Sequence, residues 1–167
     1  MEATIYKSTN KKMKKIALAT LLEEMRTAQK QIPVTAFREM LDYCMPESRP
    51  AEVEKLPVTV FSGVYNRSSG NPVLKRYTGI ILVEINRLAN RSEAEKIRGK
   101  AAEILQTLAA FVGSSGRSVK ILTRFTLPDG SLPDENRQIG LFHAHAYRRA
   151  AIFYGEQLQQ PVTPTSA

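Results

Sequence analysis

Hydrophobic residues along this chain follow two spacings, one typical of helices and one typical of strands. Leu18, Leu21, Leu22 and Met25 recur at the three- and four-residue intervals of a helix face. The same spacing predicts further helices over about 35–44, over 92–107 and around 147–158. Short apolar or β-branched runs predict strands over 2–7, 56–61, 78–86, 108–112 and 118–126.

The predicted order of elements is β, α, α, β, β, α, β, β, α, which is typical of an α/β (α+β) domain. We expect one mixed sheet with helices packed on one of its faces. The segments at 78–86, 92–107 and 108–112 would form a βαβ-like unit, with a right-handed crossover if the two strands are parallel. No linker interrupts the pattern, so we expect one domain over residues 1–158 and a polar tail over 159–167.

Local signals predict the turns and one helix start. Ser92 and Glu95 have the spacing of a capping box at the start of the 92–107 helix. Residues 66–72 are polar and predict a loop. The stretch from Gly113 to Gly116 should turn the chain between two strands and so complete a hairpin.

Composition narrows the class of protein. The chain has 24 Lys and Arg against 16 Asp and Glu, and the resulting charge of +8 favours polyanions such as nucleic acid. One cysteine, Cys44, excludes an internal disulfide and a cysteine-based zinc site. No apolar run is long enough to cross a membrane, and the N-terminus lacks the apolar stretch of a signal peptide. We therefore expect a cytoplasmic protein with no membrane partner.

A cluster of lysines near the N-terminus leaves two interpretations open. Its members are Lys7, Lys11, Lys12, Lys14 and Lys15. The cluster could contact a polyanion. The commoner role of such a run is a solvated loop that keeps the protein dissolved.

Glu84 and Asn86 are polar residues in an otherwise apolar strand. Because side chains on a strand alternate between its faces, both should point the same way, about 7 Å apart, while Val83 and Ile85 point the other way. A carboxylate beside an amide can contribute to a divalent-metal site, so Glu84 is a candidate ligand of a weak Mg²⁺ or Mn²⁺ site. The alternative is a strand end that emerges into water, with Arg87 as the partner of Glu84.

The segment 114–124 is a candidate phosphate-binding element. It offers Ser114, Ser115, Gly116 and Arg117 in a turn, followed by Lys120 and Arg124 on one face of a strand. Backbone N–H groups of a small-residue turn, together with cations, can bind the phosphates of a nucleotide or of nucleic acid. The spacing is not that of a P-loop, and a plain hairpin turn with glycine at positive φ is the alternative.

The two histidines, His143 and His145, are two residues apart. On a helix this spacing places them about 200° apart, so they do not easily share a metal. One of them can face the sheet, and a position on the helix surface or at its start is the commoner alternative. The sequence contains no Ser-His-Asp, Cys-His or HExxH arrangement.

Four segments, taken in order and with their spacing, resemble the VirE N-terminal domain family. They are residues 56–63, 77–88, 111–121 and 143–147, the last leading into Phe153 and Tyr154. The resemblance extends over about residues 2–158. This family is primase-like, occurs in bacterial mobile-element proteins, and belongs to the archaeo-eukaryotic primase-like superfamily. The resemblance therefore implies a primase-like fold with an RRM-like sheet, and a role in replication or mobilisation of a mobile element.

The resemblance also implies site residues. Glu84 and Asn86 stand at the family's acidic pair, so the second acid is an amide here. His143 stands at the family's histidine, and Ser118 replaces a family glycine. The family's later aspartate-rich segment is not in this sequence. Since two-metal nucleotidyl transfer needs carboxylates to hold both ions, we expect Glu84, Asn86 and His143 to be a degenerate catalytic set.

These observations lead to one expectation and two alternatives. We expect a degenerate or truncated primase-like domain that binds nucleic acid or nucleotide and is not an enzyme by itself. The first alternative is an active primase or polymerase domain that transfers nucleotides with Mg²⁺ or Mn²⁺. The second is a protein-interaction module for a helicase-like ATPase. For the binding site, we expect Glu84, Asn86 and Lys120 on one sheet face beside the turn at 114–117.

Overall fold

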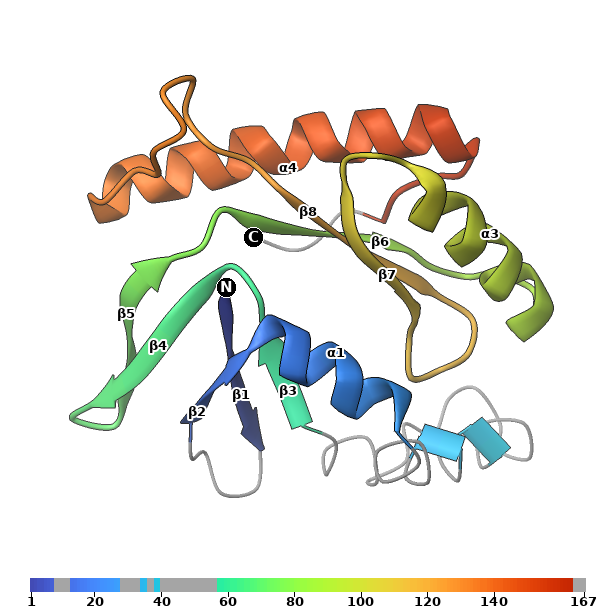
Figure 1. The fold of residues 1–167 in the computed structure, drawn as a ribbon, viewed down its shortest axis with the longest axis horizontal. Helices are drawn as coiled ribbons and strands as arrows, with labels where there is room; N and C mark the ends of the chain where they lie inside the picture. Colours follow the sequence, from blue (N-terminus) through green and yellow to red (C-terminus); the bar gives the residue numbers. More distant parts are fainter. Residues whose placement is uncertain (8–12, 28–33, 36–37, 40–56, 164–167) are drawn as a thin grey trace. The chain divides into compact units, whose positions relative to one another are not determined.

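A computed structural model describes the chain except for residues 8–12, 28–33, 36–37, 40–56 and 164–167 (Figure 1). The described part is α+β, as the sequence predicts, with three helices and three small antiparallel sheets in place of a single mixed sheet. None of its helices has the length and apolar character needed to cross a membrane. The chain divides into two compact units, Met1–Thr78 and Gly79–Ala167.

The first unit contains a three-stranded sheet with the N-terminal strand in its centre. Strand β1 (Glu2–Lys7) pairs antiparallel with β2 (Met13–Ala17) on one side and with β3 (Pro57–Val60) on the other. Helix α1 (Leu18–Arg26) follows β2 directly and buries Leu18 and Leu21. The predicted elements at 2–7, 18–25 and 56–61 are therefore confirmed.

A second sheet in this unit occupies the region predicted to be a polar loop. Strands β4 (Gly63–Ser68) and β5 (Asn71–Tyr77) form a hairpin that continues through residues 66–72. Ser69 and Gly70, both at positive φ, make the two-residue turn. The loop prediction was wrong because most side chains near the turn are exposed, so these strands lack the apolar alternation that identifies a half-buried strand.

A buried hydroxyl links the two sheets of the first unit. Thr4 of β1 is fully buried, and its Oγ1 accepts a hydrogen bond from the Tyr65 N–H of β4 at 2.9 Å. The same hydroxyl donates to the Gly63 carbonyl at 3.2 Å. The Thr4 hydroxyl therefore both donates and accepts a hydrogen bond. It connects β1 to β4, two strands that belong to different sheets.

Several predictions for the first unit lie outside the described residues. They concern most of the 35–44 helix, with Cys44, and also Lys11 and Lys12. Lys14 and Lys15 are described, and they lie exposed on strand β2 rather than in a loop. The prediction that these two lysines are exposed to solvent is confirmed, whereas the prediction that they lie in a loop was wrong.

The second unit is built on a sheet whose strand order is β6-β8-β7. Its strands are β6 (Ile80–Ile85), β7 (Thr107–Val112) and β8 (Val119–Arg124). The central strand β8 runs antiparallel to both neighbours, so β6 and β7 run in the same direction. The predicted hairpin of β7 and β8 is confirmed. The predicted βαβ-like unit is present with β8 inserted between its two strands, because the hairpin returns β8 into the space beside β6.

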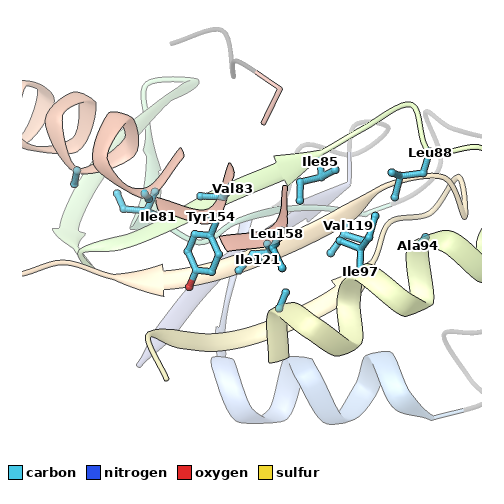
Figure 2. Close-up of a cluster of buried hydrophobic side chains, with 13 residues drawn as sticks. Ile81, Val83, Ile85, Leu88, Ala94, Ile97, Val119, Ile121, Tyr154 and Leu158 are labelled. Carbon is cyan, nitrogen blue, oxygen red and sulfur yellow. The ribbon is translucent and has the colours of Figure 1, made fainter. Parts of the chain in front are cut away.

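Helices α3 (Arg91–Glu103) and α4 (Asn136–Leu158) cover one face of this sheet. Figure 2 shows Tyr154 and Leu158 of α4 and Ile97 of α3 pointing into the same cluster as the sheet side chains. The sheet contributes Ile81, Val83, Ile85, Val119 and Ile121, which are all fully buried. This cluster is the core of the second unit.

Helix α4 begins at Asn136, well before its predicted start near residue 147. After α4 ends, the chain returns to the sheet. The Thr163 N–H donates to the Glu84 carbonyl at 2.9 Å, and the Tyr147 hydroxyl donates to the Thr163 carbonyl at 2.7 Å. Val162 packs against the core cluster. The first part of the predicted tail is thus attached to the outer edge of β6.

The capping box of α3 is displaced from its predicted position. Asn90, not Ser92, is the N-cap, and its Oδ1 accepts from the Glu93 N–H at 2.9 Å. The Glu93 carboxylate accepts from the Ala89 N–H at 2.7 Å. Glu95, the predicted partner of Ser92, instead accepts from Arg98 at 2.8 Å.

We predict that Asn90→Ala lowers the free energy of unfolding by about 1 kcal/mol, because it leaves the Glu93 N–H without its cap. Ser92→Ala is the matched control and should change stability by less than about 0.5 kcal/mol. Urea denaturation followed by circular dichroism measures both. A larger effect at Ser92 than at Asn90 would contradict the assignment.

Candidate functional site

The register of β6 and β8 brings two predicted site residues into direct contact. Glu84 is paired with Lys120 across the two strands, and the Lys120 Nζ donates to the Glu84 Oε1 at 2.7 Å. Neighbouring residues Val83 and Ile121 point into the helix-covered core, so the ion pair lies on the opposite face of the sheet. The prediction that Glu84 and Lys120 share one face is confirmed.

This ion pair is only partly exposed. The Glu84 side chain is 20% exposed and the Lys120 side chain 28%. Each charge has lost much of its hydration and depends on the other for compensation, so removing one partner leaves the other poorly solvated. The functional consequence is that Lys120 is not an uncompensated cation.

The third strand adds an aromatic ring that the sequence analysis did not single out. Phe111 of β7 is paired with Lys120 in register and therefore lies on the same face as the ion pair. Its side chain is partly buried. Phe111, Lys120 and Glu84 thus form a row across the three strands. The signal that could have revealed Phe111 is the alternation along β7, which sends Ala110 and Val112 to the core face.

The turn that joins β7 to β8, beside this row, is internally hydrogen-bonded. The Gly113 N–H donates to the Ser118 carbonyl at 2.9 Å, and the Gly116 N–H to the Gly113 carbonyl at 3.0 Å. The Arg117 N–H donates to the Ser115 Oγ at 3.2 Å. These three N–H groups are therefore engaged within the protein. The predicted phosphate cradle would have to rely on side chains more than on backbone N–H groups.

The segment after β6 is fastened to this turn. The Leu88 N–H donates to the Arg117 carbonyl at 3.1 Å, and Arg87 takes a left-handed conformation with φ of 62°. Asn86 lies just past the end of β6 and is partly exposed. This hydrogen bond joins Leu88, two residues past Asn86, to the turn, and the face on which the Asn86 side chain lies stays a prediction.

The predicted basic residues are spread along the strand and do not form one cluster. Arg117 lies exposed in the turn, and Arg124 lies exposed at the far end of β8. Lys120 and Arg124 share one face by alternation, about 13 Å apart along the strand. Leu122, which lies between them on that face, is fully buried. The accessible part of this face is thus the end that holds Phe111, Lys120 and the turn.

His143 is not brought to the ion pair. It belongs to α4, the helix that packs on the opposite face of the sheet from the Glu84 side chain. Burial lowers the pKa of His143 below its usual value of 6.5, because desolvation disfavours the imidazolium. His145 is exposed. Neither histidine is at the start of α4.

A metal at Glu84 would compete with an ammonium group already in contact with its carboxylate. Within the described residues, no three His, Cys, Asp or Glu side chains are grouped so that they could hold a metal ion. Asn86 adds an amide oxygen, which carries no negative charge. Mg²⁺ and Mn²⁺ favour hard anionic oxygens, so the side chains at this position fit a divalent ion poorly.

A comparison with protein families gives a match to the sheet and the turn just described. The family model for the BT4734-like, N-terminal domain matches residues 51–167. The chain belongs to this family. Neither the curated proteins nor the solved structures give a significant match.

The BT4734-like N-terminal domain match covers every strand that builds the candidate site. It includes β3 to β8, both helices of the second unit and the turn at 113–118, while β1, β2 and α1 precede it. The match names this family and not the VirE N-terminal family, so the primase-like resemblance stays a prediction.

We predict that Gly113→Ala destabilises the protein by about 1–3 kcal/mol through overpacking. A Cβ at position 113 would lie 2.1 Å from the Oγ and 3.5 Å from the Cβ of Ser118, which is buried. Adding Ser118→Gly should restore at least half of the loss. Gly99→Ala has open space around its Cβ and should stabilise α3 by about 0.5–1 kcal/mol. Equal losses in the single and double variants would disprove the clash.

We predict that stability falls as the pH drops below 6.5, in part because of His143. The unfolded chain binds a proton there near its usual pKa, whereas the folded protein does so only at lower pH, so acid favours unfolding. His143→Gln should flatten this part of the stability curve between pH 7.5 and 5, measured by urea denaturation. His145→Gln, on the same helix but exposed, is the matched control. An identical slope in wild type and His143→Gln would refute the prediction.

Proposed function

We propose that this chain binds single-stranded nucleic acid at the end of the β6-β8-β7 sheet that holds Phe111, Lys120 and the Arg117 turn. The observation that carries the proposal is the cross-strand row of Phe111, Lys120 and Glu84 on the sheet face away from the helices. The chain's charge of +8 and its resemblance to a primase-like family add support.

The chemistry of this row suits a single strand. An aromatic ring on a sheet face stacks with bases of any identity, at about 1–3 kcal/mol per base. Cations beside the ring contact the phosphates. Duplex nucleic acid keeps its bases stacked inside and offers little to such a ring, so we propose a preference for unpaired strands.

The ion pair sets the strength of the proposed binding. Glu84 compensates the charge of Lys120, so Lys120 contributes less than one full phosphate contact. Arg117 lies exposed in the turn and supplies a second cation there, whereas Arg124, also exposed, lies about 13 Å from Lys120 along the strand. Three full phosphate contacts would give a slope of about −2 for the logarithm of the binding constant against the logarithm of the salt concentration. Because Lys120 is partly compensated, we expect a shallower slope.

Nucleotidyl transfer is not part of the proposal. Two-metal catalysis needs several carboxylates around both ions, whereas the Glu84 carboxylate accepts a hydrogen bond from the Lys120 ammonium. A role in replication or mobilisation of a mobile element, and a helicase-like ATPase as partner, rest on the family resemblance alone.

We predict that Glu84→Gln tightens binding of a labelled oligothymidine about threefold to tenfold at low salt without metal, because it removes a negative charge beside Lys120. Lys120→Met should weaken binding by a similar factor. Fluorescence anisotropy over a series of salt concentrations measures both. Glu103→Gln, an exposed acid at the end of α3, is the control for net charge and should have a much smaller effect.

The sign of the Glu84→Gln effect separates the candidate functions. A metal-dependent site would lose binding or nucleotide incorporation when this carboxylate is removed. A protein-interaction module would bind no oligonucleotide at any salt concentration. Either result would overturn the proposal.

A further inference from the structure

The outer face of α4 carries two large apolar side chains in an otherwise charged surface. Leu141 is 68% exposed and Ile152 is 62% exposed. They are eleven residues apart, which on a helix is slightly more than three full turns, so they lie on the same side. The buried residues Ala146, Ala150 and Tyr154 lie on the side that faces the core. The exposed apolar pair is therefore a feature of the solvent face.

Seven exposed residues form one stripe along this solvent face. They are Arg137, Gln138, Leu141, His145, Arg148, Ile152 and Glu156. At 100° per residue they fall within about 100° of arc. Over 19 intervals of 1.5 Å, the stripe is about 28 Å long.

The stripe is complementary to the same stripe on a second, antiparallel copy of α4. Leu141 and Ile152 lie equally far from the midpoint between residues 146 and 147, and so do Arg137 and Glu156. Two copies of α4 placed antiparallel about a two-fold axis at that midpoint would put Leu141 against Ile152 of the second copy. They would also put Arg137 against the second copy's Glu156. Each of these contacts occurs twice, because a two-fold interface is isologous.

We propose that this stripe is the interface of a weak homodimer, with the α4 helices of two copies packed antiparallel at a shallow crossing angle. A shallow angle of about 20° keeps two helices in contact over such a length. The occupant of the face is therefore a second copy of this chain. Among the described residues, Arg137 and Glu156 form no ion pair within one chain, so both are available for this contact.

The centre of the stripe limits the strength of the dimer. His145 would face Arg148 of the second copy, and its imidazole can accept a hydrogen bond from the guanidinium. The two copies of Arg148 also approach each other near the two-fold axis, and like charges repel. A contact made by one pair of helices lies at the small end of interface sizes. We therefore expect a dissociation constant on the order of tens of micromolar.

Sedimentation equilibrium of the full chain, without nucleic acid, tests the interface at about 1–500 μM protein. Arg137→Glu and Glu156→Arg should each raise the dissociation constant roughly tenfold or more, since each places like charges in both end contacts. The double charge swap should restore it to within about threefold of wild type. Leu141→Asp should abolish dimerisation in this range. Leu105→Asp, at a position 94% exposed outside α4, is the matched control and should leave it unchanged.

Arg148→Gln distinguishes the dimer from a polyanion-binding role for the same face. It should tighten the dimer, because it removes repulsion at the axis. If the face instead serves nucleic acid, the wild type stays monomeric and Arg148→Gln weakens oligonucleotide binding. A monomer at 500 μM overturns the proposal, as does a double swap that fails to restore association. The dimer is measured without nucleic acid, so its failure leaves the proposed binding function intact.

Discussion

The pairing of β6 with β8 is the constraint on which the second unit depends. In this register Val83 and Ile85 align with Ile121 and Val119 on one face, and both helices pack there. The same register places Glu84 against Lys120 on the other face. A shift of β8 by one residue would turn Lys120 toward the helices and turn Val119 and Ile121 away from the core. Core formation and the position of the candidate site are therefore fixed by one set of backbone hydrogen bonds.

The ion pair changes what each of its two side chains can bind. Taken separately, Glu84 resembles a metal ligand and Lys120 a phosphate contact. Held 2.7 Å apart and partly buried, each satisfies the other, and neither acts without the loss of that contact. Beside the pair lie Phe111, which is partly buried, and Arg117, which is exposed in the turn. Because the Glu84 carboxylate already contacts an ammonium group, this arrangement fits a divalent metal poorly.

The sequence predicted strands most reliably where every second side chain is apolar and packs into the core. The strands at 78–86 and 118–126 and the shared face of Glu84 and Lys120 followed from that alternation. The β4–β5 hairpin did not, since exposed polar strands leave no such pattern. The N-cap of α3 is Asn90 and not the predicted Ser92. The pairs Asn90–Glu93 and Ser92–Glu95 both have capping-box spacing, and the Asn90 side chain is the one that accepts the hydrogen bond, from the Glu93 N–H. Phe111 was missed because its partner on β8 follows from the register set at the 113–118 turn, with Val112 opposite Val119, and the pattern along β7 alone does not give that register.

Photo-crosslinking tests the binding surface most directly. A single-stranded oligonucleotide with 5-iodouracil at successive positions is irradiated with the full chain, and the attached peptides are identified by mass spectrometry. We predict that the crosslink lies at Phe111 or in the 113–120 segment, and that Phe111→Leu lowers the crosslinking yield. Crosslinks confined to the first unit, with none on β7, β8 or their turn, would contradict it.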